Sequence, residues 1–153
     1  MDMNIIRIQK DYVAKLIKDE QVVFCSGMEG KVGVSDSHAC YFIPEKQMFL
    51  DKKDKGFFDA KRILRDYEEG AKLVIPTEHL KDPDGIPVQR FDSEDEDSKI
   101  FVFVQEKYLT YFGKDVRYYA INPRYPLFVV TDDDAMEMLA FIMPKMMNYS
   151  EEP

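Results

Sequence analysis

The last third of the chain alternates short runs of β-branched and aromatic residues with polar turns. Five such runs follow one another along the sequence: 100–104, 108–112, 116–121, 126–131 and 138–143. Runs of this length and composition, bounded by turn residues, predict strands. Gly113-Lys114-Asp115 and the segment 131–135 supply two of these turns. The C-terminal third is therefore predicted to consist almost entirely of β-strands.

Two segments follow a helical period instead. Apolar residues recur at helical spacing in 10–19, and in 57–70 they gather on one face. Gly70 is a natural stop for the second helix. Glu68 and Glu69 give its last turn the wrong sign for the helix dipole, and no sequence feature explains them.

The order of elements is the same in both halves of the chain. Further strands are predicted at 5–8, 21–28, 31–34, 39–44, 47–50 and 71–76, with a corner at 35–38. Residues 77–99 are predicted to be loop, with a turn at 82–85 and an exposed acidic run at 92–97. We therefore expect an α+β fold with two strand-helix-strands halves, 1–50 and 51–147. Both helices are expected on one face of an antiparallel sheet.

Length and composition predict a single folded domain. The chain has 153 residues and a mass of 18.0 kDa, and 45% of its residues are hydrophobic. This is enough to bury a core and argues against disorder. We expect the domain to span 1–147 and the residues 148–153 to form a flexible tail.

The charge and the N-terminus limit the classes of partner. A formal net charge of −8 and a pI of about 4.8 disfavour attraction to nucleic acid over the whole surface, but they allow a local basic face. The N-terminal residues lack the layout of a signal peptide, and no run approaches the length of a membrane span. A cytoplasmic protein with no membrane partner is expected.

The sequence contains few groups that could carry chemistry. Cys25 and Cys40 lie in apolar runs and are interpreted as buried thiols, although Cys40 with His38 could form a nucleophilic pair. Asp132-Asp133-Asp134 lacks the ligand spacing of a calcium loop, and the glycines match no phosphate-binding fingerprint. We therefore expect no cofactor, no metal site and no catalytic residue.

Three methionines lie near the C-terminus beside a proline. Met143, Met146 and Met147 could fill the core, or they could form an adaptable apolar surface beside Pro144, which would end a strand at an edge. The sequence leaves both interpretations open.

Two segments resemble the bacterial DNA sliding clamp, the beta subunit of DNA polymerase III. In clamps a strand ends in a Thr-Asp-Gly-His-Arg corner, which Ser35, Asp36 and His38 match in kind, whereas Ser37 and Ala39 replace the glycine and the arginine. The segment 126–146 is similar to the end of a clamp, where a hairpin finishes in a Met-Pro-Met-Arg-Leu type tail. The chain could supply only one clamp unit, so a ring would need about six copies.

The resemblance implies two sites. In clamps the tail helps line the cleft that binds polymerase and other partner peptides, which points to a groove formed by Met143, Pro144 and Met146. Clamp helices line the ring and their basic residues face the DNA backbone. Their counterparts in this chain are Lys15, Lys18, Lys61 and Arg65.

The leading hypothesis is thus a non-enzymatic, clamp-like protein that associates with double-stranded DNA or binds a partner peptide, as a replication processivity factor does. It could come from a phage or a mobile element, and it could form an oligomer. One alternative is a protein-interaction module that keeps the clamp fold without binding DNA. Another is a small thiol-dependent enzyme that uses His38 and Cys40.

Overall fold

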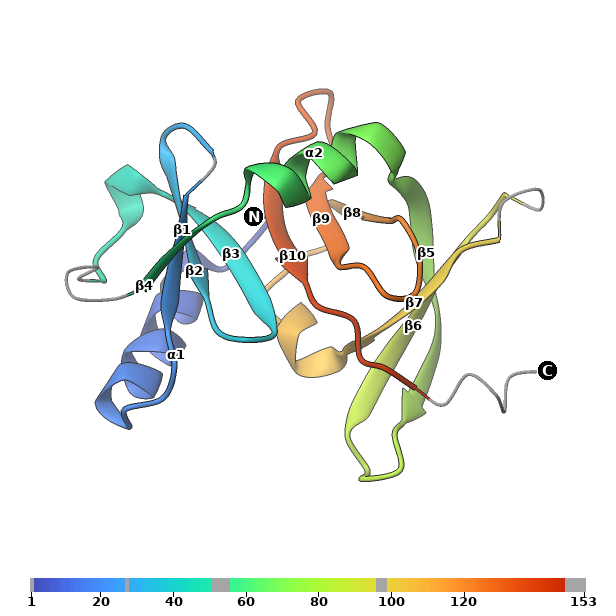
Figure 1. Cartoon of the computed structure of the whole chain (residues 1–153), viewed down its shortest axis with the longest axis horizontal. Helices are drawn as coiled ribbons and strands as arrows, with labels where there is room; N and C mark the ends of the chain where they lie inside the picture. The colour runs from blue at the N-terminus through green and yellow to red at the C-terminus, as the bar shows by residue number, and fades with distance from the viewer. Residues whose placement is uncertain (1, 27, 51–55, 96–98, 148–153) are drawn as a thin grey trace.

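The computed structural model describes residues 2–26, 28–50, 56–95 and 99–147 of the chain (Figure 1). In this part the protein is an α+β fold with two α-helices and one mixed sheet of ten strands. The helices are α1 (Ile5–Ile17) and α2 (Lys61–Gly70). The strands are β1 (Val23–Ser26), β2 (Lys31–Ser35), β3 (Ala39–Pro44), β4 (Gly56–Asp59), β5 (Lys72–Lys81), β6 (Pro87–Ser93), β7 (Phe101–Gln105), β8 (Val116–Ala120), β9 (Leu127–Thr131) and β10 (Met138–Ile142).

The strands follow the spatial order β4-β1-β2-β3-β10-β9-β8-β5-β6-β7. All neighbours are antiparallel except β1 and β4, which run parallel. The six strands from β10 to β7 curl round in Figure 1, and the chain that leaves β10 returns to the outer strand β7. There the Lys145 N–H donates to the Phe103 carbonyl at 2.7 Å. This part of the sheet is therefore close to a closed barrel.

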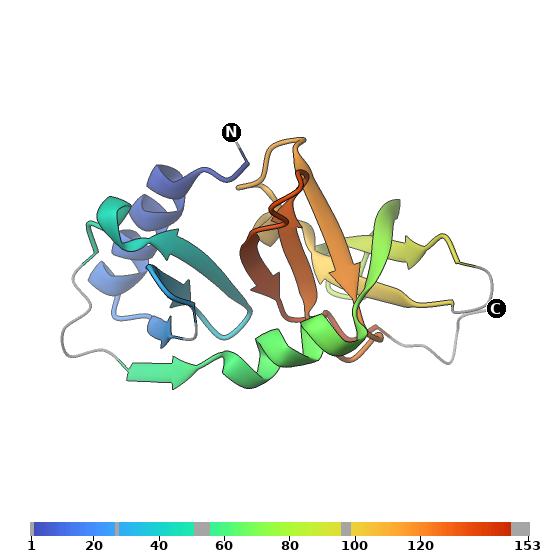
Figure 2. The ribbon, with the colours of Figure 1, turned by 90° about the horizontal axis from the view of Figure 1, so that it is seen from above.

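The sheet separates two hydrophobic cores. Side chains of β3 alternate between them: Tyr41 packs in one core with Tyr12 of α1, whereas Cys40 and Phe42 pack in the other, against Leu64 of α2. The prediction that both helices lie on one face is therefore wrong, and they cover opposite faces (Figure 2). The physical reason lies in β3, β9 and β10, which are buried at nearly every position and so need cover on both sides.

The predicted division into halves at residue 50 is not a boundary in the sheet. β4 and β10 of the second predicted half pair with β1 and β3 of the first, so the sheet continues across the predicted boundary. Local assignments also differ. Residues 5–8 begin α1 because the Asn4 side chain accepts the Arg7 N–H and caps the helix there.

Several other predicted elements differ from those in the structure. Residues 56–59 form β4 rather than the start of the second helix, and β5 extends through 77–81 into the predicted loop. The segments 47–50 and 108–112 contain 3₁₀ turns (Glu45–Gln47 and Glu106–Leu109) and no strand. The predicted tail, 148–153, lies outside the described residues.

Candidate binding pockets at the strand seam

The two parts of the sheet meet where β3 lies beside β10. Only three residue pairs join these strands, and the last of them matches Tyr41 with Ala140. Beyond Tyr41 the end of β3 and the start of β10 are no longer paired with each other. We call this unpaired junction the seam.

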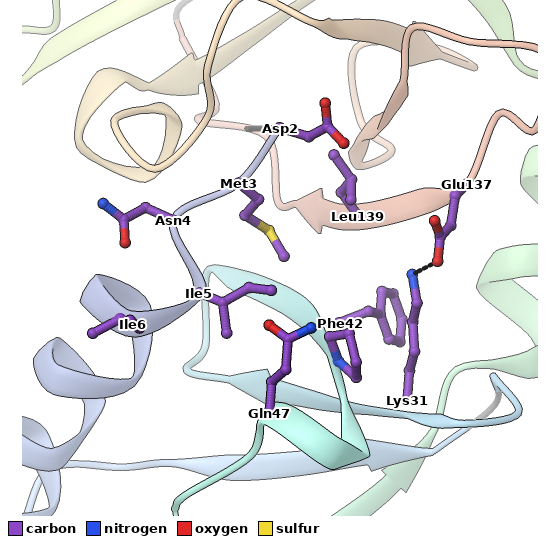
Figure 3. Close-up of a pocket in the computed structure, with 11 residues that line it drawn as sticks. Asp2, Met3, Asn4, Ile5, Ile6, Lys31, Phe42, Gln47, Glu137 and Leu139 are labelled. Carbon is purple, nitrogen blue, oxygen red and sulfur yellow. Dashed lines mark ion pairs between the residues drawn. The ribbon is translucent and has the colours of Figure 1, made fainter.

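A pocket of about 320 Å³ lies at the seam (Figure 3). Its walls are mainly apolar and come from Met3, Ile5, Phe42 and Leu139. Figure 3 shows that these side chains come from the N-terminal segment and from strands on the two sides of the seam. We call this cavity the seam pocket.

An ion pair forms the polar wall of the seam pocket. The Lys31 ammonium lies 2.6 Å from the Glu137 carboxylate and donates to the Met138 carbonyl at 3.2 Å. The Lys31 side chain is only 10% exposed, whereas that of Glu137 is 53% exposed. A nearly buried ammonium needs these partners, because desolvation of an unpaired charge is costly. The pair also ties β2 to the start of β10 across the seam.

The N-terminal segment is held in place as a wall of the pocket. The Asn4 N–H donates to the Tyr111 carbonyl at 2.8 Å, and the Gly113 N–H donates to the Asp2 carbonyl at 2.9 Å. Met3 forms a β-bridge with Phe112. These backbone bonds fix the start of α1 over the seam, so the pocket is formed before a ligand arrives.

A second, more open groove adjoins the seam pocket and shares Glu137 with it. It measures about 600 Å³ and runs between α2 and the turn that connects β9 to β10. Met28, Met136 and Met138 line it, and Lys61 and Arg65 of α2 lie on its wall. We call it the α2 groove. Methionine side chains adapt to differently shaped ligands, so this surface suits peptide binding.

The four predicted DNA-contacting residues do not form one surface. Lys15 lies on α1, 3.6 Å from both Glu20 and Asp36, and Lys18 follows α1 as its exposed C-cap. Lys61 and Arg65 are exposed on α2, on the other face of the sheet. Whether either pair contacts DNA stays a prediction.

The structure does not bring His38 and Cys40 together. Cys40 is buried in the core beneath α2, and burial raises the pKa of its thiol well above the usual value. His38 is exposed, and its ring lies 5.7 Å from that of Tyr108, which belongs to the opposite core. Cys25 is also buried and donates to the Ser26 carbonyl at 3.2 Å. Neither thiol has the exposure or the neighbouring base that activates a nucleophile.

Met143 and Met146 are 41% and 50% exposed, so their side chains do not fill the core. Backbone bonds hold the segment on both sides of Pro144: the Met143 N–H donates to the His38 carbonyl, and Lys145 bonds to β7. The seam pocket and the α2 groove are lined by other residues. The peptide groove at Met143, Pro144 and Met146 therefore stays a prediction. The exposure of the two methionines is consistent with it.

Sequence reasoning missed the residues of the seam pocket. Lys31 is the first residue of an apolar run, which indicates that its charge needs a partner near the core. No local sequence pattern identifies Glu137 as that partner. Among the described residues, no three His, Cys, Asp or Glu side chains gather in a way that could hold a metal ion. In the same part of the chain, neither helix is long and apolar enough to cross a membrane. Comparison with protein-family models, curated proteins and solved structures finds no match to this chain.

Proposed function

We propose that this chain is a non-enzymatic binding protein that anchors an apolar side chain of a partner peptide in the seam pocket. The observation that carries the proposal is the pocket itself, a preformed apolar cavity with one ion pair on its wall. Cavities of a few hundred Å³ with apolar walls and few polar groups are typical ligand sites. About 320 Å³ suits one large aliphatic or aromatic side chain.

The ion pair gives the pocket a means of orienting its ligand. The Lys31 ammonium has three donor hydrogens and two partners in the structure, the Glu137 carboxylate and the Met138 carbonyl. A peptide carbonyl at the pocket mouth could accept the third hydrogen. The exposed oxygens of Glu137 could in turn accept a peptide N–H. The apolar anchor would supply affinity and these polar groups would set direction.

The α2 groove supports the peptide proposal because it provides room for the residues beside the anchor. It adjoins the seam pocket at Glu137 and is lined by three methionines. The resemblance to sliding clamps agrees with partner-peptide binding, although it points to the C-terminal methionines instead. Peptide affinities in the micromolar range, about −8 kcal/mol, would suit a site of this size.

The proposal can be tested by filling the pocket. A random peptide library is selected against the wild-type chain, and the enriched peptide is labelled and titrated by fluorescence anisotropy. Ile5→Phe places extra volume in the cavity, so we expect affinity to fall about tenfold or more, a change of about 1.4 kcal/mol. The melting temperature should stay the same or rise, because a filled cavity gains contacts.

Ile17→Phe is the matched control. It makes the same substitution in the same helix at a side chain that is 79% exposed, so it should leave peptide affinity unchanged. Equal binding by the wild-type and Ile5→Phe chains would show that the seam pocket does not hold the peptide.

A further inference from the structure

The charges of α2 are arranged against the dipole of the helix. Its first turn carries Lys61 and Arg62 and no acidic residue, and its last turn carries Glu68 and Glu69 and no basic residue. The N-terminus of a helix favours negative charge and the C-terminus positive charge. Both ends of α2 therefore have the destabilising sign.

The residues before α2 compensate for these charges only in part. Its N-cap is Ala60, which offers no side-chain acceptor, although Asp59 accepts the Lys61 N–H at 2.9 Å. In α1, by contrast, Asn4 caps the first turn and Lys15 lies in the last turn. Charges that destabilise their own helix are expected where the residues have a functional role.

Five charged side chains of α2 are exposed, whereas the sixth, Asp66, is half-buried and accepts the Tyr125 hydroxyl at 2.6 Å. Ile63, Leu64 and Tyr67 pack inward against the core. In the described part of the chain, none of the exposed charged residues of α2 forms an ion pair: Lys61, Arg62, Arg65, Glu68 and Glu69. Among the described residues, their cost to the helix is thus not offset by an ion pair.

We propose that α2 is the dimerisation helix of this protein and that its occupant is α2 of a second copy, lying antiparallel across a two-fold axis. An antiparallel arrangement places the basic first turn of each helix beside the acidic last turn of the other. Both ends are then neutralised at once, because an isologous interface repeats every contact. The two helix dipoles also oppose each other, which is their favourable relative orientation.

The charge of the whole chain has the same polarity as α2. Among the described residues, those up to 65 include nine basic and eight acidic residues, whereas those from 66 to 147 include nine basic and fifteen acidic residues. Figure 2 shows α2 along one side of the molecule, leading from β4 at its first turn to β5 at its last. An antiparallel pair of copies would therefore place the nearly neutral part of each chain beside the acidic part of the other. A helix of a different protein does not have this complementary charge pattern as a consequence of symmetry. The charge pattern therefore favours a second copy of this chain as the partner.

Two charge-reversal variants of α2 test the proposed dimer, and a mixture of the two should restore it. The first variant, Lys61→Glu with Arg62→Glu, makes both ends of α2 acidic. The second, Glu68→Lys with Glu69→Lys, makes both ends basic. Self-association is measured by sedimentation velocity over a wide range of protein and salt concentrations. The wild-type chain should dimerise more weakly as salt rises, and each variant should self-associate at least about tenfold more weakly, because like charges then face each other.

A mixture of the two variants should restore the dimer, because its acidic and basic helices are complementary at both ends. Both variants improve the match with the helix dipole, so at dilute, monomeric concentrations their melting temperatures should equal or exceed that of the wild-type chain. Loss of the dimer could then not be attributed to misfolding. Lys10→Glu with Lys18→Glu makes the same charge change on α1 and its C-cap, and it should leave dimerisation unaffected.

Three results would overturn the proposal: a wild-type chain that stays monomeric at high concentration and low salt, variants that still dimerise alone, or a mixture that does not associate. None of these depends on peptide binding in the seam pocket, which the Ile5→Phe titration tests separately.

Discussion

Gly33 occupies a position in β2 where any larger residue would clash with two cysteines. A Cβ atom at this position would lie 2.6 Å from both the Cys25 Cβ and the Cys40 Sγ. One contact involves a Cβ, which cannot move without its backbone. The two thiols and the glycine therefore form one packed unit across β1, β2 and β3, which accounts for both cysteines as packing residues.

We expect Gly33→Ala to destabilise the fold by about 1–3 kcal/mol through overpacking. Gly70→Ala is the matched control, because no atom lies within 4 Å of the added Cβ and Gly70 ends α2. That change should be neutral or stabilise by about 0.5–1 kcal/mol. Urea unfolding of both variants measures the difference. Equal stabilities would mean that the three strands can separate locally at little cost.

The segment after β10 is attached to the hairpin of β5 and β6 by one buried carboxylate. The Asp82 side chain is 2% exposed, and one of its oxygens accepts the N–H groups of Asp84 and Ile86, both at 2.9 Å. The other oxygen lies 3.0 Å from the Lys145 ammonium. The bond from the Ile86 N–H, assisted by Lys145, holds the pKa of Asp82 below its usual value, although burial acts in the opposite direction.

This shift predicts acid release of the C-terminal segment. Because the pKa of Asp82 is lowered in the folded state, its contribution to stability is present above the unfolded value of about 3.9 and is lost as the pH falls through the folded value. The methyl signals of Met143 and Met146 in NMR spectra should therefore shift below about pH 4.

Asp82→Asn separates this effect from general acid unfolding. Asparagine can still accept the two turn N–H groups but cannot pair with Lys145 as a charge. At neutral pH the variant should already show the methyl shifts that the wild-type chain shows in acid. Unchanged methyl signals in Asp82→Asn would mean that backbone bonds alone hold the segment.

Local chemistry predicted the elements whose signals lie within a few residues. The corner at 35–38 forms as expected, because the Asp36 carboxylate accepts the N–H groups of His38 and Ala39. The turn at 82–85 likewise forms around Asp82. Strands 31–35 and 39–44 follow directly from their apolar, β-branched composition.

The missed elements depend on distant partners. β5 is exposed at most positions and contains Pro76, so no apolar period identifies its outer half, and pairing with β6 extends it to Lys81. The pairing of β4 with β1 joins segments that have no shared pattern. The seam pocket arises from the same kind of contact, because Lys31 meets Glu137 only after β10 has joined β3. Single-sequence periodicity contains no information about such pairings.

The opposite placement of the helices determines how the whole molecule could meet DNA. A DNA duplex that lies against α2 could contact Lys61, Arg62 and Arg65. Lys15 and Lys18 lie on the other face of the sheet, and Lys15 is already paired with Glu20 and Asp36. A ring of the sliding-clamp type would instead turn both helices of each unit toward one duplex. The number of phosphates neutralised separates these arrangements.

We expect duplex DNA to bind weakly and through α2 alone. Contact with about three phosphates predicts a slope of about −3 for the logarithm of the affinity against the logarithm of the salt concentration, and contact by both helices would bring it to about −4.5. Fluorescence anisotropy of a labelled duplex measures this slope, with the chain dilute enough to be monomeric, since the proposed dimer would cover the same residues.

Lys61→Glu with Arg62→Glu should flatten the slope, and Lys10→Glu with Lys18→Glu should not change it. A slope steeper than −4 that flattens in the α1 variant would favour the ring arrangement, and the absence of any binding would remove DNA from the partners of this chain.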